Sequence, residues 1–162
     1  YYMDQIDDIK KTIAEQQLDI VPVEGQELDE EQQTALDDAI AQITDEDIYN
    51  YILEMNPDVK GIFATNGDTT MQALTACEGK DMKDVVIMGY DADQEEIDAM
   101  KDGRIAGMIV QNPYGMGYAT VVAEARCVLN MGNEANVNTG YTWVTPDNIE
   151  DRTVQDILYA EK

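Results

Sequence analysis

The chain has 162 residues, which fits one domain of ordinary size, and 44% of them are hydrophobic, which is enough to bury a core. It carries 34 acidic residues against 10 basic ones, a formal net charge of −24, and no histidine. So negative a surface argues against binding to nucleic acid or anionic lipid, and the lack of histidine excludes the usual zinc sites and Ser-His-Asp or Cys-His catalysis.

Other sequence features narrow the class further. No run approaches the ~18 apolar residues of a membrane span, and no D-x-D-x-D-G loop supports calcium binding, so we expect no metal site and no cofactor. Cys77 and Cys127 lie in helix-like segments and are interpreted as small buried hydrophobes, while a disulfide between them stays open. The chain starts at Tyr1 without an initiator methionine or signal peptide, which suggests a mature or excised piece.

The first third of the chain predicts mainly helices. Apolar residues recur at helical spacing over 3–17, which indicates an amphipathic helix. The β-rich segment LDIVPV, residues 18–23, predicts a strand. Between 29 and 55 the helical phase breaks after Ile43, and Thr44-Asp45-Glu46-Asp47 has the pattern of a capping box. We therefore predict two consecutive helices there.

The rest of the chain alternates short apolar strands with helices. Strands are predicted at 59–65, 84–90, 104–110 and 141–144, and helices at 69–77, 94–101, 113–131 and 151–159. Asp68 or Thr69 is the expected N-cap of the 69–77 helix. This alternation predicts an α/β fold with a parallel sheet and helices on both faces.

Three predicted strands end at a hydrogen-bonding side chain: Asn66, Asp91 and Gln111. In parallel sheets ligands bind beyond the carboxyl ends of the strands, so these side chains can converge on one small polar ligand. Carboxylate and carboxamide groups suit the vicinal hydroxyls of a sugar. The alternative is that each residue is an ordinary loop residue or helix cap, and local chemistry leaves both open.

A family resemblance bears on that choice. The segment NPDVKGIFATNGDTTMQAL, followed by KDVVIMGYDADQEEIDAMKDGRIAGMIVQNPYGMG, resembles periplasmic sugar-binding proteins of the ribose-binding type. The shared features are the strand ending at Asn66, the Gly89-Tyr90-Asp91 motif, and the stretch from Ile97 through Gln111 to Gly117. The resemblance is continuous over residues 56–131.

The resemblance implies a Rossmann-like lobe of a type 1 periplasmic binding protein. The whole protein would have two α/β lobes joined by hinge strands, with residues 1–111 as the C-terminal ligand-binding lobe. Residues 112–140 would form a helix that packs on the missing N-terminal lobe, and 141–162 the final hinge strand and C-terminal tail. In the isolated chain that helix would either repack or pair with a second copy, and our hypothesis is the second, a homodimer.

The resemblance also assigns ligand contacts. Asn66, Asp91 and Gln111 would bind the sugar, and Gln5 aligns with an arginine that often does so in the family. The family's Asn-Asp pair is Asn66-Gly67 here, so one acidic side chain is lost. An aromatic residue that commonly stacks on the sugar is also absent, with Leu28 its nearest substitute.

The expected function is the solute-binding component of an ABC transporter, which binds a sugar or similar small polyhydroxylated ligand by hinge closure and delivers it to a permease. Its expected location is extracytoplasmic, either periplasmic or as a cell-surface lipoprotein. The alternative is the effector-binding core of a LacI-type transcription regulator, which shares this fold. We expect no enzyme activity and no catalytic residue, because no G-x-G-x-x-G motif, P-loop or activated nucleophile is present.

Overall fold

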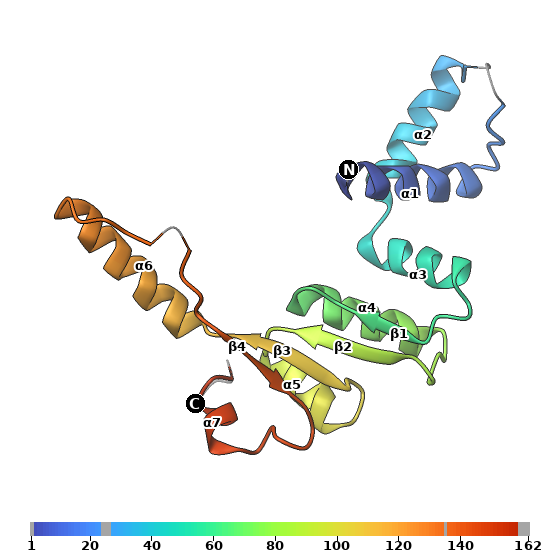
Figure 1. Cartoon of the computed structure of the whole chain (residues 1–162). Coiled ribbons are helices and arrows are strands. Elements are labelled where there is room, and N and C mark those ends of the chain that lie inside the picture. Colours follow the sequence, from blue (N-terminus) through green and yellow to red (C-terminus); the bar gives the residue numbers. More distant parts are fainter. Residues whose placement is uncertain (1, 24–26, 135, 159–162) are drawn as a thin grey trace. The chain divides into compact units, whose positions relative to one another are not determined.

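The structure is a computed structural model that describes residues 2–23, 27–134 and 136–158 (Figure 1). The elements in chain order are α1 (Tyr2–Gln17), α2 (Glu30–Gln42), α3 (Asp45–Met55), β1 (Gly61–Phe63), α4 (Gly67–Gly79), β2 (Val86–Tyr90), α5 (Gln94–Lys101), β3 (Gly107–Gln111), α6 (Pro113–Val128), β4 (Tyr141–Val144) and α7 (Arg152–Gln155). They form two compact units, one of residues 1–59 with 75–82 and the other of residues 60–74 with 83–162.

The first unit contains α1, α2 and α3, which pack around a small apolar core. Ile13, Ile43 and Ile48 are buried at its centre, and Ile6 and Ile9 pack against them. The helical spacing of the isoleucines in α1 therefore serves to cover the junction between α2 and α3.

The break between α2 and α3 lies where the sequence predicts it. Thr44 is the N-cap of α3, and its backbone N–H donates to Asp47 Oδ2 at 2.8 Å in a capping box. The Thr44 hydroxyl donates to the same carboxylate at 2.6 Å. These hydrogen bonds lower the pKa of Asp47, the hydroxyl more than the backbone N–H.

The strand predicted at 18–23 is wrong. The backbone N–H groups of Leu18 and Ile20 donate to Ala14 and Glu15 carbonyls, so they close the end of α1. The following residues have no regular structure, and Val21 and Val23 are 77% and 57% exposed. A strand exists only when a neighbour supplies its hydrogen bonds, and β propensity alone does not provide that neighbour.

The second unit is built on a mostly parallel sheet, which confirms the predicted α/β class. Within the described residues the sheet has four strands in the order β1-β2-β3-β4. The first three are parallel, with Ile62 opposite Ile87 and Gly89 opposite Met108. The last strand, β4, runs antiparallel to β3. The carboxyl ends of β1, β2 and β3 therefore meet at one edge.

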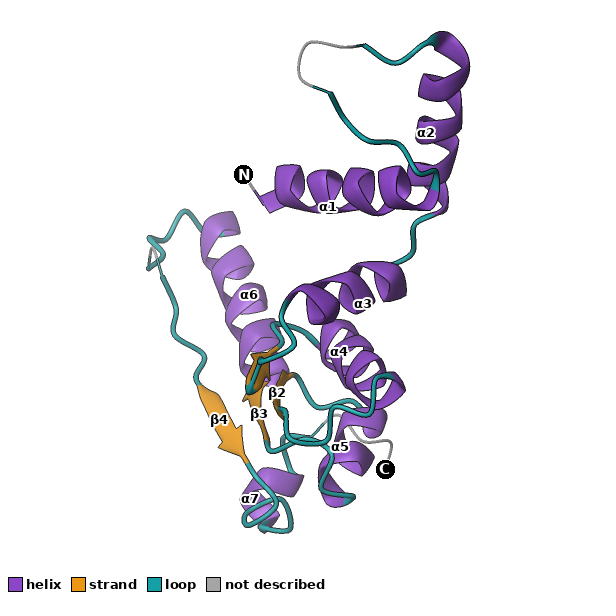
Figure 2. Cartoon of the chain, turned by 90° about the vertical axis from the view of Figure 1, so that its right-hand side faces the viewer, coloured by secondary structure: helices purple, strands orange, loops and turns teal. Residues whose placement is uncertain are grey.

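One face of this sheet is covered by helices. Ile87, Met108 and Val144 point to that face and are at most 3% exposed. A Cβ atom on Gly89 would meet side chains of both α4 and α5, so these two helices lie on the same side of β2 (Figure 2). The opposite face, which we expected to be covered as well, leaves Phe63 and Trp143 exposed at 53% and 39%.

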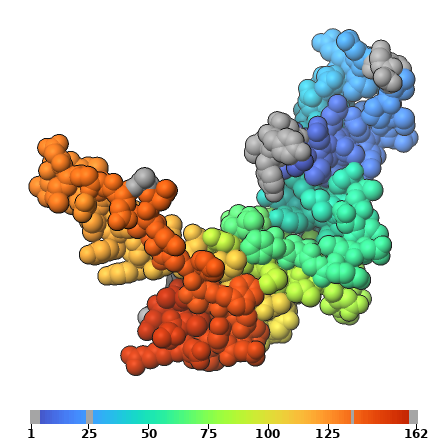
Figure 3. Space-filling model, in the orientation of Figure 1, coloured from blue at the N-terminus to red at the C-terminus, as the bar shows by residue number. Residues whose placement is uncertain are grey.

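Helix α6 projects from the end of β3 and contains no buried residue. Asn112 caps it, because its Oδ1 accepts from the Gly115 N–H at 2.8 Å. The side chains of α6 lie largely at the surface (Figure 3). The predicted burial of Cys127 is wrong, because the segment after α6 reaches its thiol only through Asn133 and leaves it exposed. Cys77 is buried as predicted, and both thiols are free.

The other predicted helices are found in the structure, although some of them begin or end at different residues. Helix α5 spans the predicted residues, whereas α7 covers only four of those predicted at 151–159, of which 159 lies outside the described residues. In the described ranges, no helix combines the length and apolar character needed to cross a membrane.

Candidate functional site

Asp91 and Gln111 lie together at the carboxyl edge of the sheet. Asp91 directly follows β2, and Gln111 ends β3, its parallel neighbour. The Gln111 Nε2 group donates a hydrogen bond of 2.8 Å to Asp91 Oδ1, and both side chains are half-buried. The predicted convergence of these two residues is therefore found in the structure, and each orients the other.

Asp91 has an unusual backbone conformation that fixes its side chain. Its φ angle is +80°, in the left-handed region that residues other than glycine rarely adopt. Its N–H donates to the Ile109 carbonyl at 2.9 Å, which holds the turn against β3. Strained backbone of this kind occurs preferentially where a side chain must be aimed at a ligand.

Asn66 has a local structural role at the same edge. Its Oδ1 accepts from the Thr69 N–H at 2.9 Å, so Asn66 itself caps α4. The predicted cap, Asp68 or Thr69, is wrong because both residues lie inside the first turn of the helix. Asn66 is exposed, and its Nδ2 group makes no hydrogen bond within the described part of the chain. The Nδ2 group therefore stays accessible for a ligand acceptor.

Thr70 connects the ends of β1 and β2 and was not predicted from the sequence. Its hydroxyl donates to the Asn66 carbonyl at 2.7 Å and accepts from the Tyr90 N–H at 3.4 Å. The side chain is fully buried. Through Thr70, the backbones just before Gly67 and Asp91 are held at a fixed separation.

Glu96 is the second residue that sequence analysis missed. It lies in α5 and is fully buried, and its Oε2 accepts from the Asp93 N–H at 3.1 Å. Burial raises the pKa of this carboxyl group to about 7, and the hydrogen bond from the Asp93 N–H opposes that rise. Helical spacing gave a signal for this burial, because Glu96 shares a face with Ala99 and Met100.

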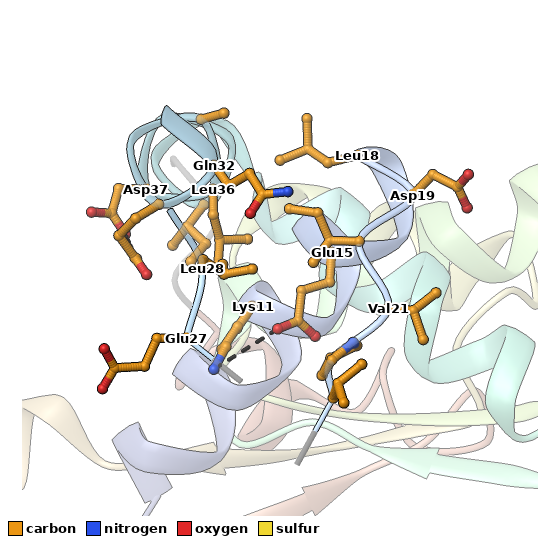
Figure 4. Close-up of a pocket in the computed structure, with 16 residues that line it drawn as sticks. Lys11, Glu15, Leu18, Asp19, Val21, Glu27, Leu28, Gln32, Leu36 and Asp37 are labelled. Carbon is orange, nitrogen blue, oxygen red and sulfur yellow. Dashed lines mark hydrogen bonds and ion pairs between the residues drawn. The ribbon is translucent and has the colours of Figure 1, made fainter. Parts of the chain in front are cut away.

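The remaining predicted contact lies in the other unit. Gln5 is an exposed residue of α1, and its role in binding stays a prediction. That unit also contains a pocket of about 920 Å³ between α1, residues 18–23 and α2 (Figure 4). Lys11 and Glu15 form an ion pair of 3.8 Å on its α1 wall. No strand-end residue lines this pocket.

Comparison with known proteins shows what this chain is similar to. The sequence model of the periplasmic binding protein domain matches residues 2–127. The ribose import binding protein of Salmonella typhimurium is 35% identical over 66 residues, which are 41% of this chain and 22% of that protein.

Solved structures agree with this match. A carbohydrate transporter solute-binding protein from Agrobacterium radiobacter, in complex with D-arabinose, has a TM-score of 0.63 at 26% identity. The match covers 80% of this chain and 50% of that one. An ABC transporter, LacI family transcriptional regulator from Brachyspira murdochii has a TM-score of 0.61 at 24% identity, over 72% of this chain and 41% of that one.

The chain thus corresponds to a part of these relatives, half or less of the length of each. The family match covers most of its residues, from α1 into the last turn of α6. The chain belongs to the periplasmic binding protein domain family.

Proposed function

We propose that this chain is the ligand-binding part of the solute-binding component of an ABC transporter. Its ligand is a sugar or a similar small polyhydroxylated molecule, bound at Asn66, Asp91 and Gln111 with a further contact from Gln5. The names of the relatives support this proposal, since they are ribose import and carbohydrate transporter binding proteins.

The observation that carries the proposal is the hydrogen-bonded pair of Asp91 and Gln111. A carboxylate and a carboxamide held 2.8 Å apart present acceptors and a donor at fixed spacing. Vicinal hydroxyl groups match that spacing, and a ligand that lacks one of them would leave a buried group unpaired. The pair therefore suits selection of a polyol rather than an apolar ligand.

Calorimetry with a panel of D-ribose, D-arabinose, D-allose and myo-inositol tests the proposal. It is run on this chain and on the longer protein that contains it, with Asp91→Asn as the test variant. Asparagine tolerates the same positive φ and still accepts from Gln111, so the fold is retained while the charge is lost. We expect affinity to fall roughly tenfold to a hundredfold, the range for hydrogen bonds to charged groups.

Asp98→Asn is the matched control. Asp98 is an exposed residue of α5 whose carboxylate accepts from Gln94, away from the strand ends. Its replacement should leave affinity unchanged. If no polyol binds either form of the protein, or if Asp91→Asn binds as tightly as the original, the proposed site is wrong.

The wider proposal concerns the rest of the protein. We infer that a second, N-terminal lobe completes the binding site and that α6 packs on it, with residues 1–111 as the C-terminal lobe, 112–140 as the packing segment, and 141–162 as the last hinge strand and tail. The half-length match to the Agrobacterium protein supports a second lobe. The ligand would favour the closed state by contacting both lobes.

Partners and location follow from the same proposal. The permease of an ABC transporter would receive the ligand, and the protein would reside outside the cytoplasm, either in the periplasm or as a cell-surface lipoprotein. In the isolated chain, α6 pairs with a second copy. The LacI-type alternative is supported by the Brachyspira protein at the level of fold alone.

A further inference from the structure

The carboxyl group of Glu96 is an unusual feature of the second unit. Its side chain has no exposed surface, and its Oε1 has no hydrogen-bond partner in the described residues. The Thr70 hydroxyl donates to the Asn66 carbonyl 2.7 Å away, and Oε1 is left without a donor. An unpaired, ionised oxygen in this position is costly, whereas a protonated one can donate to the Thr70 oxygen.

Two glycines make the space that this carboxyl group occupies. A Cβ atom on Gly67 would lie 3.2 Å from Glu96 Oε2, and one on Gly89 would lie 3.3 Å from Oε1. Gly67 follows Asn66 at the end of β1, and Gly89 lies two residues before Asp91 at the end of β2. The carboxyl group therefore contacts both segments that carry predicted ligand residues.

The charged groups facing Glu96 are all acidic. Asp91 and Asp93 lie in the loop before α5, and their charges add to the rise in the pKa of Glu96 that burial causes. Asp68 of α4 and Glu95 of α5 line the same groove, whose volume is about 440 Å³. No basic residue lines that groove. The negative charges of Asp91 and Asp93 therefore oppose the ionisation of Glu96.

We propose that Glu96 is a positioning residue for the strand-end site: its protonated carboxyl group holds the ends of β1 and β2 together, and its ionisation loosens them and weakens ligand binding. Ionisation removes the hydrogen that can reach Thr70 and places a negative charge beside Asp91 and Asp93. The effect on the strand ends is a property of this chain alone. The effect on affinity rests on the proposed polyol function.

Amide hydrogen exchange without ligand provides the first test. The Tyr90 N–H, which donates to Thr70, reports on the contact between the strand ends. Because Glu96 has a pKa of about 7, we expect the protection factor of Tyr90 to fall between about pH 6 and about pH 8. A protection factor that stays constant over this range overturns the proposal.

Glu96→Gln separates protonation from packing. Glutamine has the same shape, keeps the acceptor for the Asp93 N–H and never ionises, so Tyr90 protection at about pH 8 should match that of the original chain at about pH 6. Glu95→Gln, on the exposed neighbour in α5, should keep the original pH dependence. A purely structural role would instead make Glu96→Gln equally less protected at every pH.

A second measurement needs no variant. The pKa of Glu96 is raised in the folded chain, so the folded state holds a proton that the unfolded state releases. Thermal stability should therefore decline as pH rises from the ordinary carboxyl range to about 7, and this contribution should be constant above that. A carbon-13 carboxyl titration of Glu96 that follows an ordinary glutamate overturns the proposal even if Glu96→Gln does not fold.

Calorimetry with D-ribose at the two pH values completes the test. If binding requires the protonated form, affinity should be about tenfold weaker at pH 8 than at pH 6, and Glu96→Gln should remove the difference. Binding of D-ribose that is independent of pH overturns the proposal while leaving the polyol function intact. If the protection of Tyr90 depends on pH but no polyol binds, the positioning role is supported and the proposed function is contradicted.

Discussion

At Gly89 the end of β2 has no room for a side chain. A Cβ atom there would lie 2.7 Å from Thr70 Cγ2 and 3.2 Å from Thr70 Oγ1. Gly89→Ala should therefore lower the free energy of unfolding by about 2 kcal/mol, the usual effect of overpacking a buried position. Urea denaturation of the purified chain measures this change.

Two further variants identify the cause of that loss. Thr70→Ser removes Cγ2 and keeps the hydroxyl that joins the strand ends, so the double variant with Gly89→Ala should recover most of the lost stability. Gly61→Ala is the control, because its Cβ would meet only the Val86 carbonyl at an ordinary 3.5 Å. A double variant no more stable than Gly89→Ala would contradict the contact with Thr70.

The position and role of some residues could be predicted from the sequence, and those of others could not. Asp91 and Gln111 could be predicted because each ends a strand, and neighbouring parallel strands bring their ends to one edge. Helical spacing places Glu96 on the buried face of α5, but its position beside Gly67 and Gly89 could not be predicted, because those glycines come from other elements. Asn66 was placed at the correct edge, but its capping role follows from the exact first turn of α4.

For the helices, local hydrogen bonds set the boundaries. Thr44→Ala removes the hydroxyl that accepts from the Asp47 N–H at 3.3 Å and donates to its carboxylate. We expect a loss of about 1 kcal/mol in stability, typical for an N-cap threonine. The helical circular dichroism signal during urea denaturation reports this loss.

Thr34→Ala is the control for the cap. Thr34 is an exposed residue inside α2, and its hydroxyl only donates back to the Glu30 carbonyl. Alanine has the higher helix propensity, so this change should be neutral or slightly stabilising. Equal losses in the two variants would contradict a specific capping contribution from Thr44.

Whether an element depends on adjacent residues or on distant ones explains which elements could be predicted. Helix starts such as that of α3 depend on a few adjacent residues, so the Thr44 capping box was found from sequence. The strand expected at 18–23 needs a partner from elsewhere in the chain, and no local pattern supplies that information. The prediction that Cys127 is buried failed for a similar reason. Helical spacing identifies a face of α6 but does not show what covers that face.

The charge of the whole molecule is uneven along the chain. Residues 113–131 contain one acidic residue, Glu124, and one basic residue, Arg126, in a chain whose net charge is −24. A second copy can therefore approach along α6 with less repulsion than along other surfaces, and Val121 and Tyr118 offer exposed apolar contacts, each 66% exposed.

We expect sedimentation velocity to show a dimer whose fraction rises with protein concentration and with salt, because salt screens the repulsion between the acidic copies. Val121→Asp should weaken the dimer without affecting the fold, since the side chain is exposed. Val21→Asp is the control, at an exposed valine of the other unit. A monomer at every concentration and salt level would contradict pairing through α6.

The open face of the sheet has one further consequence. Trp143 is the single tryptophan of the chain, and it lies on that face against the Cα of Gly107. Indole fluorescence moves to shorter wavelength when water is removed from the ring. Any partner that covers this face of β3 and β4 will therefore shift the emission of Trp143 to shorter wavelength. The unlabelled protein is enough for this measurement.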